Sequence, residues 1–115
     1  MVEVTVQLPE SLANRIKPLG VWMPALMEIA LAGFRTRAAQ VAADLIGFLE
    51  KNPLPKDVLL YRASKKSNDR LNRLMALSEA GVLSAEEKCE LRELEKLEHI
   101  VVMLKAQAGR ILKES

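Results

Sequence analysis

Hydrophobic and polar residues alternate at the start of the chain, which is the spacing of a β-strand. One side of residues 2–8 carries Val2, Val4, Val6 and Leu8, and the other carries Glu3, Thr5 and Gln7. The sequence holds no second run of this kind. Because a strand cannot satisfy its backbone hydrogen bonds alone, the pattern predicts that residues 2–8 pair with the same segment of a second copy of the chain.

The rest of the hydrophobic pattern has helical spacing. Pro9 and Glu10 begin a short helix that ends near Lys17, since proline suits the first turn and an acid there complements the helix dipole. The run "MPALMEIALAGF" begins a second helix, which we expect to continue to Glu50. In a chain of 115 residues, so apolar a helix implies a partner chain that covers it.

Two further helices are expected over residues 66–79 and 85–112. Gly81 stops the first, and Ser84 with Glu87 forms a capping box for the second. The segment "EAGVLS" joins them as an αα-hairpin. The prolines of "KNPLPK" break the chain before them. The predicted fold is therefore mainly α with one N-terminal strand. Its parts are a dimerisation head (residues 1–50), a linker (51–65) and a hairpin arm (66–115).

The order "VTVQLPESLANRI", a turn and "PALMEIALAGF" resembles the ribbon-helix-helix fold of the Arc and methionine repressors and of many bacterial antitoxins. The resemblance covers about residues 2–35. It implies a homodimer whose paired strands enter the DNA major groove. Val2, Val4, Val6 and Leu8 would then form the dimer core, and Glu3, Thr5 and Gln7 would contact base edges of an operator.

The segment "LNRLMALSEAGVLSAEEKCELRELEKLEHIVVMLKAQA" is similar to the C-terminal part of small cyanobacterial proteins that look like antitoxins encoded beside a nuclease. This similarity implies an arm that neutralises a nuclease toxin. The candidate partner-binding residues are cations after the linker and apolar residues of the last helix: Arg62, Lys65, Lys66, Arg70, Arg73, Leu94, Leu97 and Val101. The alternative for the cations is a solvated helix face.

Charge leaves two functions open. Residues 1–55 hold five basic and five acidic side chains, whereas phosphate neutralisation supplies most non-specific affinity for DNA. The chain is therefore either an antitoxin-like regulator that dimerises, binds a toxin and reads operator DNA through its ribbon, or a helical oligomerising adaptor that binds no nucleic acid.

Other chemistry has little support in the sequence. No glycine-rich phosphate loop or cluster of histidine and cysteine occurs, so we expect no enzymatic activity, no cofactor and no metal. His99 is the one histidine, and Cys89 is the one cysteine. A free thiol in a helix is ordinary in a reducing cytoplasm, where we expect the protein to reside, without a membrane partner. Trp22 is expected to pack at the junction of the first two helices, although an exposed partner anchor is the alternative.

Overall fold

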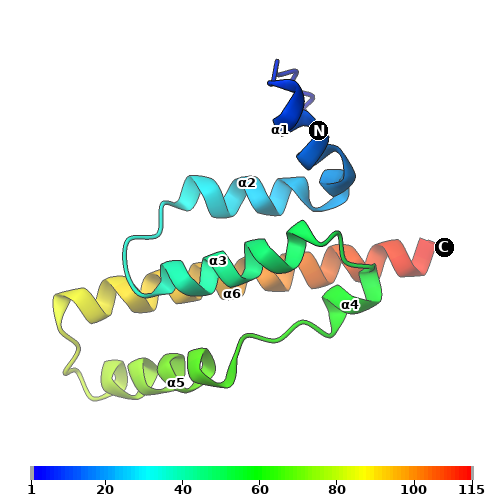
Figure 1. Ribbon diagram of the computed structural model, residues 1–115. Coiled ribbons are helices and arrows are strands. Elements are labelled where there is room, and N and C mark those ends of the chain that lie inside the picture. Colours follow the sequence, from blue (N-terminus) through cyan, green and yellow to red (C-terminus); the bar gives the residue numbers. More distant parts are fainter. Residues whose placement is uncertain (1, 115) are drawn as a thin grey trace.

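The computed structural model describes residues 2–114, in which every regular element is helical (Figure 1). In chain order the elements are α1 (Glu10–Ile16), the 3-10 helix η1 (Lys17–Trp22), α2 (Met23–Ala32), α3 (Ala38–Glu50), α4 (Pro55–Leu59), α5 (Lys65–Glu79) and α6 (Ala85–Glu114). The long α6 runs through the middle of the molecule, and α2, α3, α4 and α5 all pack against it.

The core is a single cluster built on one stripe of α6. The buried stripe consists of Leu91, Leu94, Leu97, Ile100, Leu104 and Ala108. The other helices add Ala38, Ala42, Leu45 and Leu49 from α3, Val58 from α4, Leu74 from α5 and Ile29 from α2. These residues recur every three or four positions along α3 and α6, so each helix presents one apolar side to the other.

Trp22 completes this core at the junction of η1 and α2. Its side chain is 1% exposed, and its indole N–H donates to the carbonyl oxygen of Pro53 at 3.1 Å. The predicted packing of Trp22 is therefore confirmed. The amide of Gln107 on α6 donates to the carbonyl of Val21 at 2.8 Å, which holds the same junction against the C-terminal half of α6.

The strand predicted for residues 2–8 is wrong. Residues 2–9 have no regular secondary structure, and the described part of the chain contains no strand. All four apolar side chains assigned to a dimer core are exposed, from 88% at Val2 to 39% at Leu8, with Val4 and Val6 between them. The alternation is real, but a strand forms only where a second backbone accepts its hydrogen bonds.

The helix predicted to run unbroken from Met23 to Glu50 is also interrupted. Gly33 has φ 65° and ends α2, because glycine adopts the left-handed conformation without the strain of a Cβ atom. The turn that follows is held from α6. The carboxylate of Glu93 accepts hydrogen bonds from the backbone N–H groups of Arg35 and Thr36 and from the Thr36 hydroxyl, at 2.7–3.1 Å.

The two C-terminal helices are confirmed as α5 and α6. Gly81 has φ 72° and lies just after the end of α5. The capping box is also confirmed, because the Ser84 hydroxyl accepts from the backbone N–H of Glu87 while the Glu87 carboxylate accepts from that of Ser84. The expected linker contains α4, whose packing against α6 is the most extensive between any two helices of residues 2–114.

The molecule is elongated, with principal extents of 47 × 33 × 26 Å and a radius of gyration of 16.0 Å. A compact domain of this length has a radius of gyration of about 13 Å. Figure 1 shows the reason: α1 projects from one side of the α3–α6 layer, and α5 lies on the opposite side. The fold therefore leaves much of its apolar surface uncovered.

The turn between α2 and α3 supplies a test of this architecture. Glu93→Gln keeps the shape of the side chain but removes the charge that strengthens its hydrogen bonds to Arg35 and Thr36. We expect a loss of about 1–2 kcal/mol in the free energy of unfolding, measured by urea titration at pH 7. Glu95→Gln, two residues away on the exposed side of α6, should change it by less than about 0.5 kcal/mol. Equal effects of the two variants would contradict the proposed role of Glu93.

Candidate functional site

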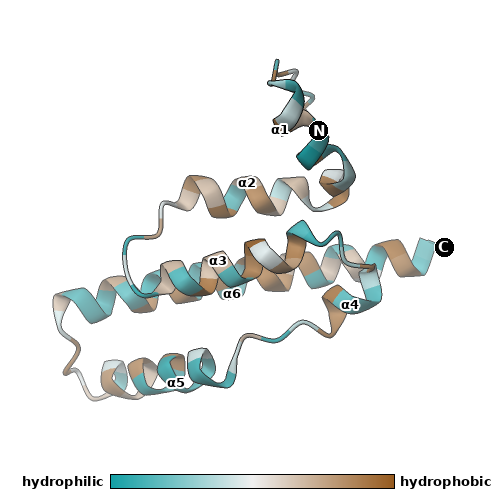
Figure 2. Cartoon of the chain, viewed as in Figure 1, coloured by the Kyte–Doolittle hydropathy of each residue, from teal (hydrophilic) through white to brown (hydrophobic). Residues whose placement is uncertain are grey.

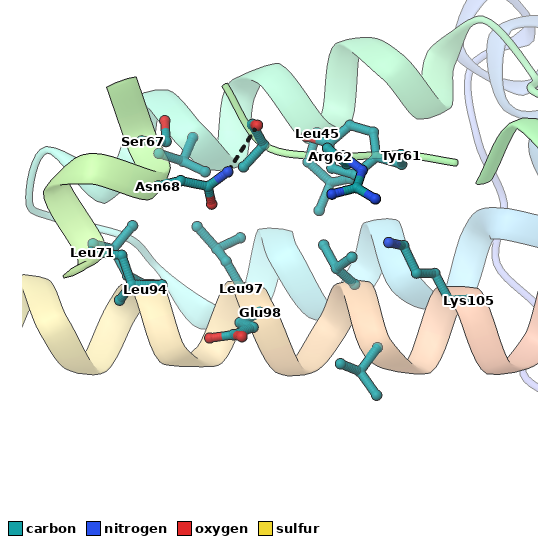
Figure 3. Close-up of a pocket in the computed structure, with 14 residues that line it drawn as sticks. Leu45, Tyr61, Arg62, Ser67, Asn68, Leu71, Leu94, Leu97, Glu98 and Lys105 are labelled. Atoms are coloured by element: carbon teal, nitrogen blue, oxygen red, sulfur yellow. Dashed lines mark hydrogen bonds between the residues drawn. The ribbon is translucent and has the colours of Figure 1, made fainter. Parts of the chain in front are cut away.

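A groove on the surface of α6 is the candidate binding site. It encloses about 300 Å³ between α3, α6, the N-terminal half of α5 and the segment that connects α4 to α5 (Figure 3). It forms because residues 60–64 carry the chain away from α3 before α5 begins. As a result, α5 covers only the first turns of the α6 stripe.

The floor of the groove is apolar. It consists of Leu94, Leu97, Val101 and Val102 from α6, Val41 and Leu45 from α3, and Leu71 from α5. The positions on α6 from Leu94 to Lys105 follow one face of the helix for three turns, or about 16 Å. Val102 is 59% exposed, so the groove is open to solvent along this side.

The rim of the groove is polar and has different character at its two ends. Figure 3 shows Arg62 and Lys105 at one end, with their nitrogen atoms turned toward the space between them. Ser67 and Asn68 lie at the other end, where the Asn68 amide donates to the carbonyl of Ala63 at 3.3 Å. Glu98 lies at the edge of α6 between the two ends.

Tyr61 forms part of the wall beside Arg62. Its ring lies 4.7 Å from that of Phe48, measured between centroids and tilted by 42°. Burial raises the pKa of the Tyr61 hydroxyl, and the nearby Asp44 carboxylate raises it further. The hydroxyl is therefore neutral at physiological pH and serves as a hydrogen-bond donor and acceptor rather than a base.

A second pocket of about 320 Å³ adjoins the groove and shares Val41, Ser67 and Leu94 with it. Its main feature is an ion pair between α5 and α6. The Arg70 guanidinium donates two hydrogen bonds to the Glu90 carboxylate, at 2.8 and 2.9 Å. This side-chain hydrogen bonding lowers the pKa of Glu90, overcoming the burial that raises it, and raises the pKa of Arg70. Arg70 is therefore already engaged.

The structure separates the predicted partner-binding residues into three groups. Arg62, Leu94, Leu97 and Val101 line the groove, and Lys66 and Arg70 line the adjoining pocket. Lys65 and Arg73 are exposed on α5 and line neither. The prediction omits Lys105, Tyr61 and Val102. Lys105 follows Val101 by four residues, so its place on the same helix face is readable from the sequence, whereas Tyr61 is positioned only by the tertiary fold.

The residues predicted to read DNA do not form a ribbon surface. Glu3, Thr5 and Gln7 are exposed along the irregular segment 2–9. Beside α1, a shallow apolar pocket of about 430 Å³ lies between α1, η1, α2 and α3. Its lining includes Leu12, Ile16, Leu19, Leu26, Met27 and Ile46. The N-terminal third of the chain therefore presents apolar surface rather than base-reading side chains.

Residues 2–114 contain no group of three or more histidine, cysteine, aspartate or glutamate side chains that could hold a metal ion. Cys89 and His99 are both exposed on α6. No helix among these residues is long and apolar enough to cross a membrane. The groove offers apolar contact on its floor and charged side chains at its rim.

Comparison with protein-family models, with curated proteins and with solved structures found no match to this chain. The resemblances to ribbon-helix-helix proteins and to antitoxin-like proteins therefore stay predictions.

The pairing of Arg70 with Glu90 predicts a dependence of stability on pH. Because the pKa of folded Glu90 lies below its ordinary value of 4.5, the unfolded chain binds more protons in this range. The stabilisation is therefore present above pH 4.5 and is lost as the pH falls through the folded pKa. At pH 7, Glu90→Gln should lower the free energy of unfolding by about 1–3 kcal/mol.

The measurement is urea unfolding at pH 7, 4.5 and 3. The difference between wild type and Glu90→Gln should shrink as the pH falls below 4.5, because wild-type Glu90 takes up a proton as the pH approaches its lowered pKa. Glu79→Gln, exposed at the end of α5, serves as the control and should follow the wild type. A difference that stays constant across the three pH values would show that the Glu90 charge contributes nothing.

Proposed function

We propose that this protein is an antitoxin-like binding protein that holds a segment of a partner protein in the groove on α6 and thereby neutralises that partner. The observation that carries the proposal is the open apolar floor of the groove, bordered by Arg62 and Lys105. Apolar floors with a few polar groups at the rim are typical of binding sites. The similarity of residues 71–108 to the C-terminal part of antitoxin-like proteins supports the same assignment.

The expected operator binding is not part of this proposal. It depended on a paired ribbon that presents Glu3, Thr5 and Gln7, and the described residues contain no strand.

Growth of the organism that encodes the protein tests the antitoxin function. Silencing an antitoxin gene releases its toxin, so we expect growth to stop and to resume when the wild-type protein is supplied. Val102→Glu places a charge on the exposed edge of the groove and should not restore growth. Met103→Glu, the matched control, changes a residue of similar exposure that faces away from the groove and should restore it.

Both variants should give the wild-type circular dichroism spectrum, since each residue is about half exposed in the fold. Full rescue by Val102→Glu would remove the groove from the mechanism. Continued growth after silencing would contradict the antitoxin function itself.

The second candidate function is the oligomerising adaptor, and it is favoured by the exposed apolar surface of the N-terminal third. Figure 2 shows hydrophobic colouring along most of α2, whose single charge is Glu28. The exposed large hydrophobic side chains of this region are Val2, Val4, Val6, Leu8, Leu12, Val21, Met27 and Leu31. Contiguous apolar surface of this kind marks protein–protein contact.

Sedimentation equilibrium tests self-association at this surface. Leu31 is 84% exposed, so Leu31→Glu leaves the folded chain intact. We expect it to weaken a micromolar dimer about tenfold or more, because a charge would then lie in an apolar contact, at a cost of about 1.4 kcal/mol or more. Leu60→Glu, at 76% exposure on the end of α4, is the control and should leave the dimer unchanged. A wild-type protein that stays monomeric at every protein and salt concentration tested would exclude the adaptor.

A further inference from the structure

The two ends of the groove differ in charge, and this difference bears on what the groove binds. Within residues 2–114, no hydrogen bond or ion pair engages Arg62 or Lys105. They come from opposite walls, Arg62 from the segment before α5 and Lys105 from α6. At the other end the groove is lined by Ser67 and Asn68. Of the two cations in the pocket that adjoins this end, Lys66 and Arg70, the second is paired with Glu90. Both cations that line the groove itself therefore lie at one end of it.

The size of the groove restricts its occupant. A volume of about 300 Å³ lies at the lower end for ligand sites. It admits only a few side chains of an occupant, whose backbone then lies along the open side of the groove. The floor from Leu94 to Lys105 is about 16 Å long, which an extended chain covers with about five residues. A short extended peptide fits these dimensions.

We propose that the groove binds a short extended segment of the partner protein whose apolar side chains lie on Val101 and Val102 and whose neighbouring acidic residue lies between Arg62 and Lys105. This inference rests on the proposed function and names the chemistry of its partner. A carboxylate in this position would accept charge-assisted hydrogen bonds from two cations. A basic residue there would meet like charges, so the groove selects against basic segments.

The position of the acid within the segment follows from the same arrangement. The apolar residues lie toward the Ser67 end and the acid toward the Lys105 end. Glu98 lies at the edge between them and disfavours a second acid near the middle of the segment. The expected motif is therefore two or three apolar residues with one Asp or Glu on one side of them.

Selection from a phage library of random twelve-residue peptides tests the proposal on the full chain. Peptides enriched on the wild type should carry an acidic residue at a fixed distance from an apolar pair. The double charge reversal R62E/K105E should bind them at least tenfold more weakly and should instead enrich peptides with Lys or Arg at that position. A peptide whose acid is changed to lysine should regain binding to R62E/K105E. This recovery would show that the loss of affinity comes from the charge contact and not from damage to the fold.

The control variant is K56E/K113E, which changes the net charge of the protein by the same amount at two exposed lysines outside the groove. It should select the same acidic peptides as the wild type. Loss of binding by the control as severe as by R62E/K105E would show a general charge effect and overturn the inference.

The outcomes separate this inference from the proposed function. The selected peptides could show no preference for an acidic residue and still lose their binding to the Val102→Glu variant. This result would overturn the inference and leave the groove as a protein-binding site. Enrichment of no peptide at all would count against both. A change in the oligomeric state of R62E/K105E would assign the groove to a second copy of this chain and would likewise overturn the inference.

Discussion

The apolar stripe of α6 is the constraint on which the rest of the structure depends. At 30 residues, α6 is about 45 Å long and sets the long dimension of the molecule, 47 Å. The next longest helix, α5, has only 15 residues, so α2, α3, α4 and α5 each cover only a part of the stripe. A short chain that stacks several small helices along one long helix buries one side of each and leaves the spaces between them open.

The groove is a direct consequence of this arrangement. The connection after α4 leads α5 away from α3, and the groove between them is lined by the α6 face from Leu94 to Lys105. Leu94 and Leu97 are buried on this face, whereas Val102 is exposed. Polar side chains at its border keep such a surface soluble while its floor stays apolar. The Arg70–Glu90 pair fixes α5 at one side of the opening, so the opening is a fixed feature of the packing. Stability and binding surface therefore come from the same helix.

The helices could be predicted from the sequence wherever local chemistry decides them. Ser84 and Glu87 cap α6, and Gly81 ends α5, through contacts within a few residues, and both predictions are confirmed. The break after Gly33 has the same kind of local signal, a glycine in the left-handed conformation, and the prediction missed it. The contact that holds the following turn could not be predicted, because it joins Thr36 to Glu93, 57 residues later. The alternation of residues 2–8 misled for a related reason: the pattern describes what a segment can do beside a suitable backbone, and no such backbone lies beside it in the chain.

The residues of the candidate site also differ in how far the sequence predicts them. Leu94, Leu97 and Val101 belong to a stripe that is visible in the sequence, yet a stripe does not say which of its residues a neighbouring helix will cover. Arg62 and Arg70 cannot be told apart in the sequence of this basic segment. In the fold, Arg70 forms an ion pair with Glu90, whereas Arg62 lines the groove. Only the packing of α5 against α6 separates them.

Hydrogen exchange of the full chain, followed amide by amide, tests most directly the claim that α6 organises the fold. The slowest amides should lie between Leu94 and Leu104, and those of α3 around Leu45 and Leu49 should share their opening free energy, because the two helices unfold together when the stripe is exposed. Exchange of the α6 amides between Leu94 and Leu104 that is faster than that of α5 would contradict this account, since α6 would then not be the element that the other helices depend on.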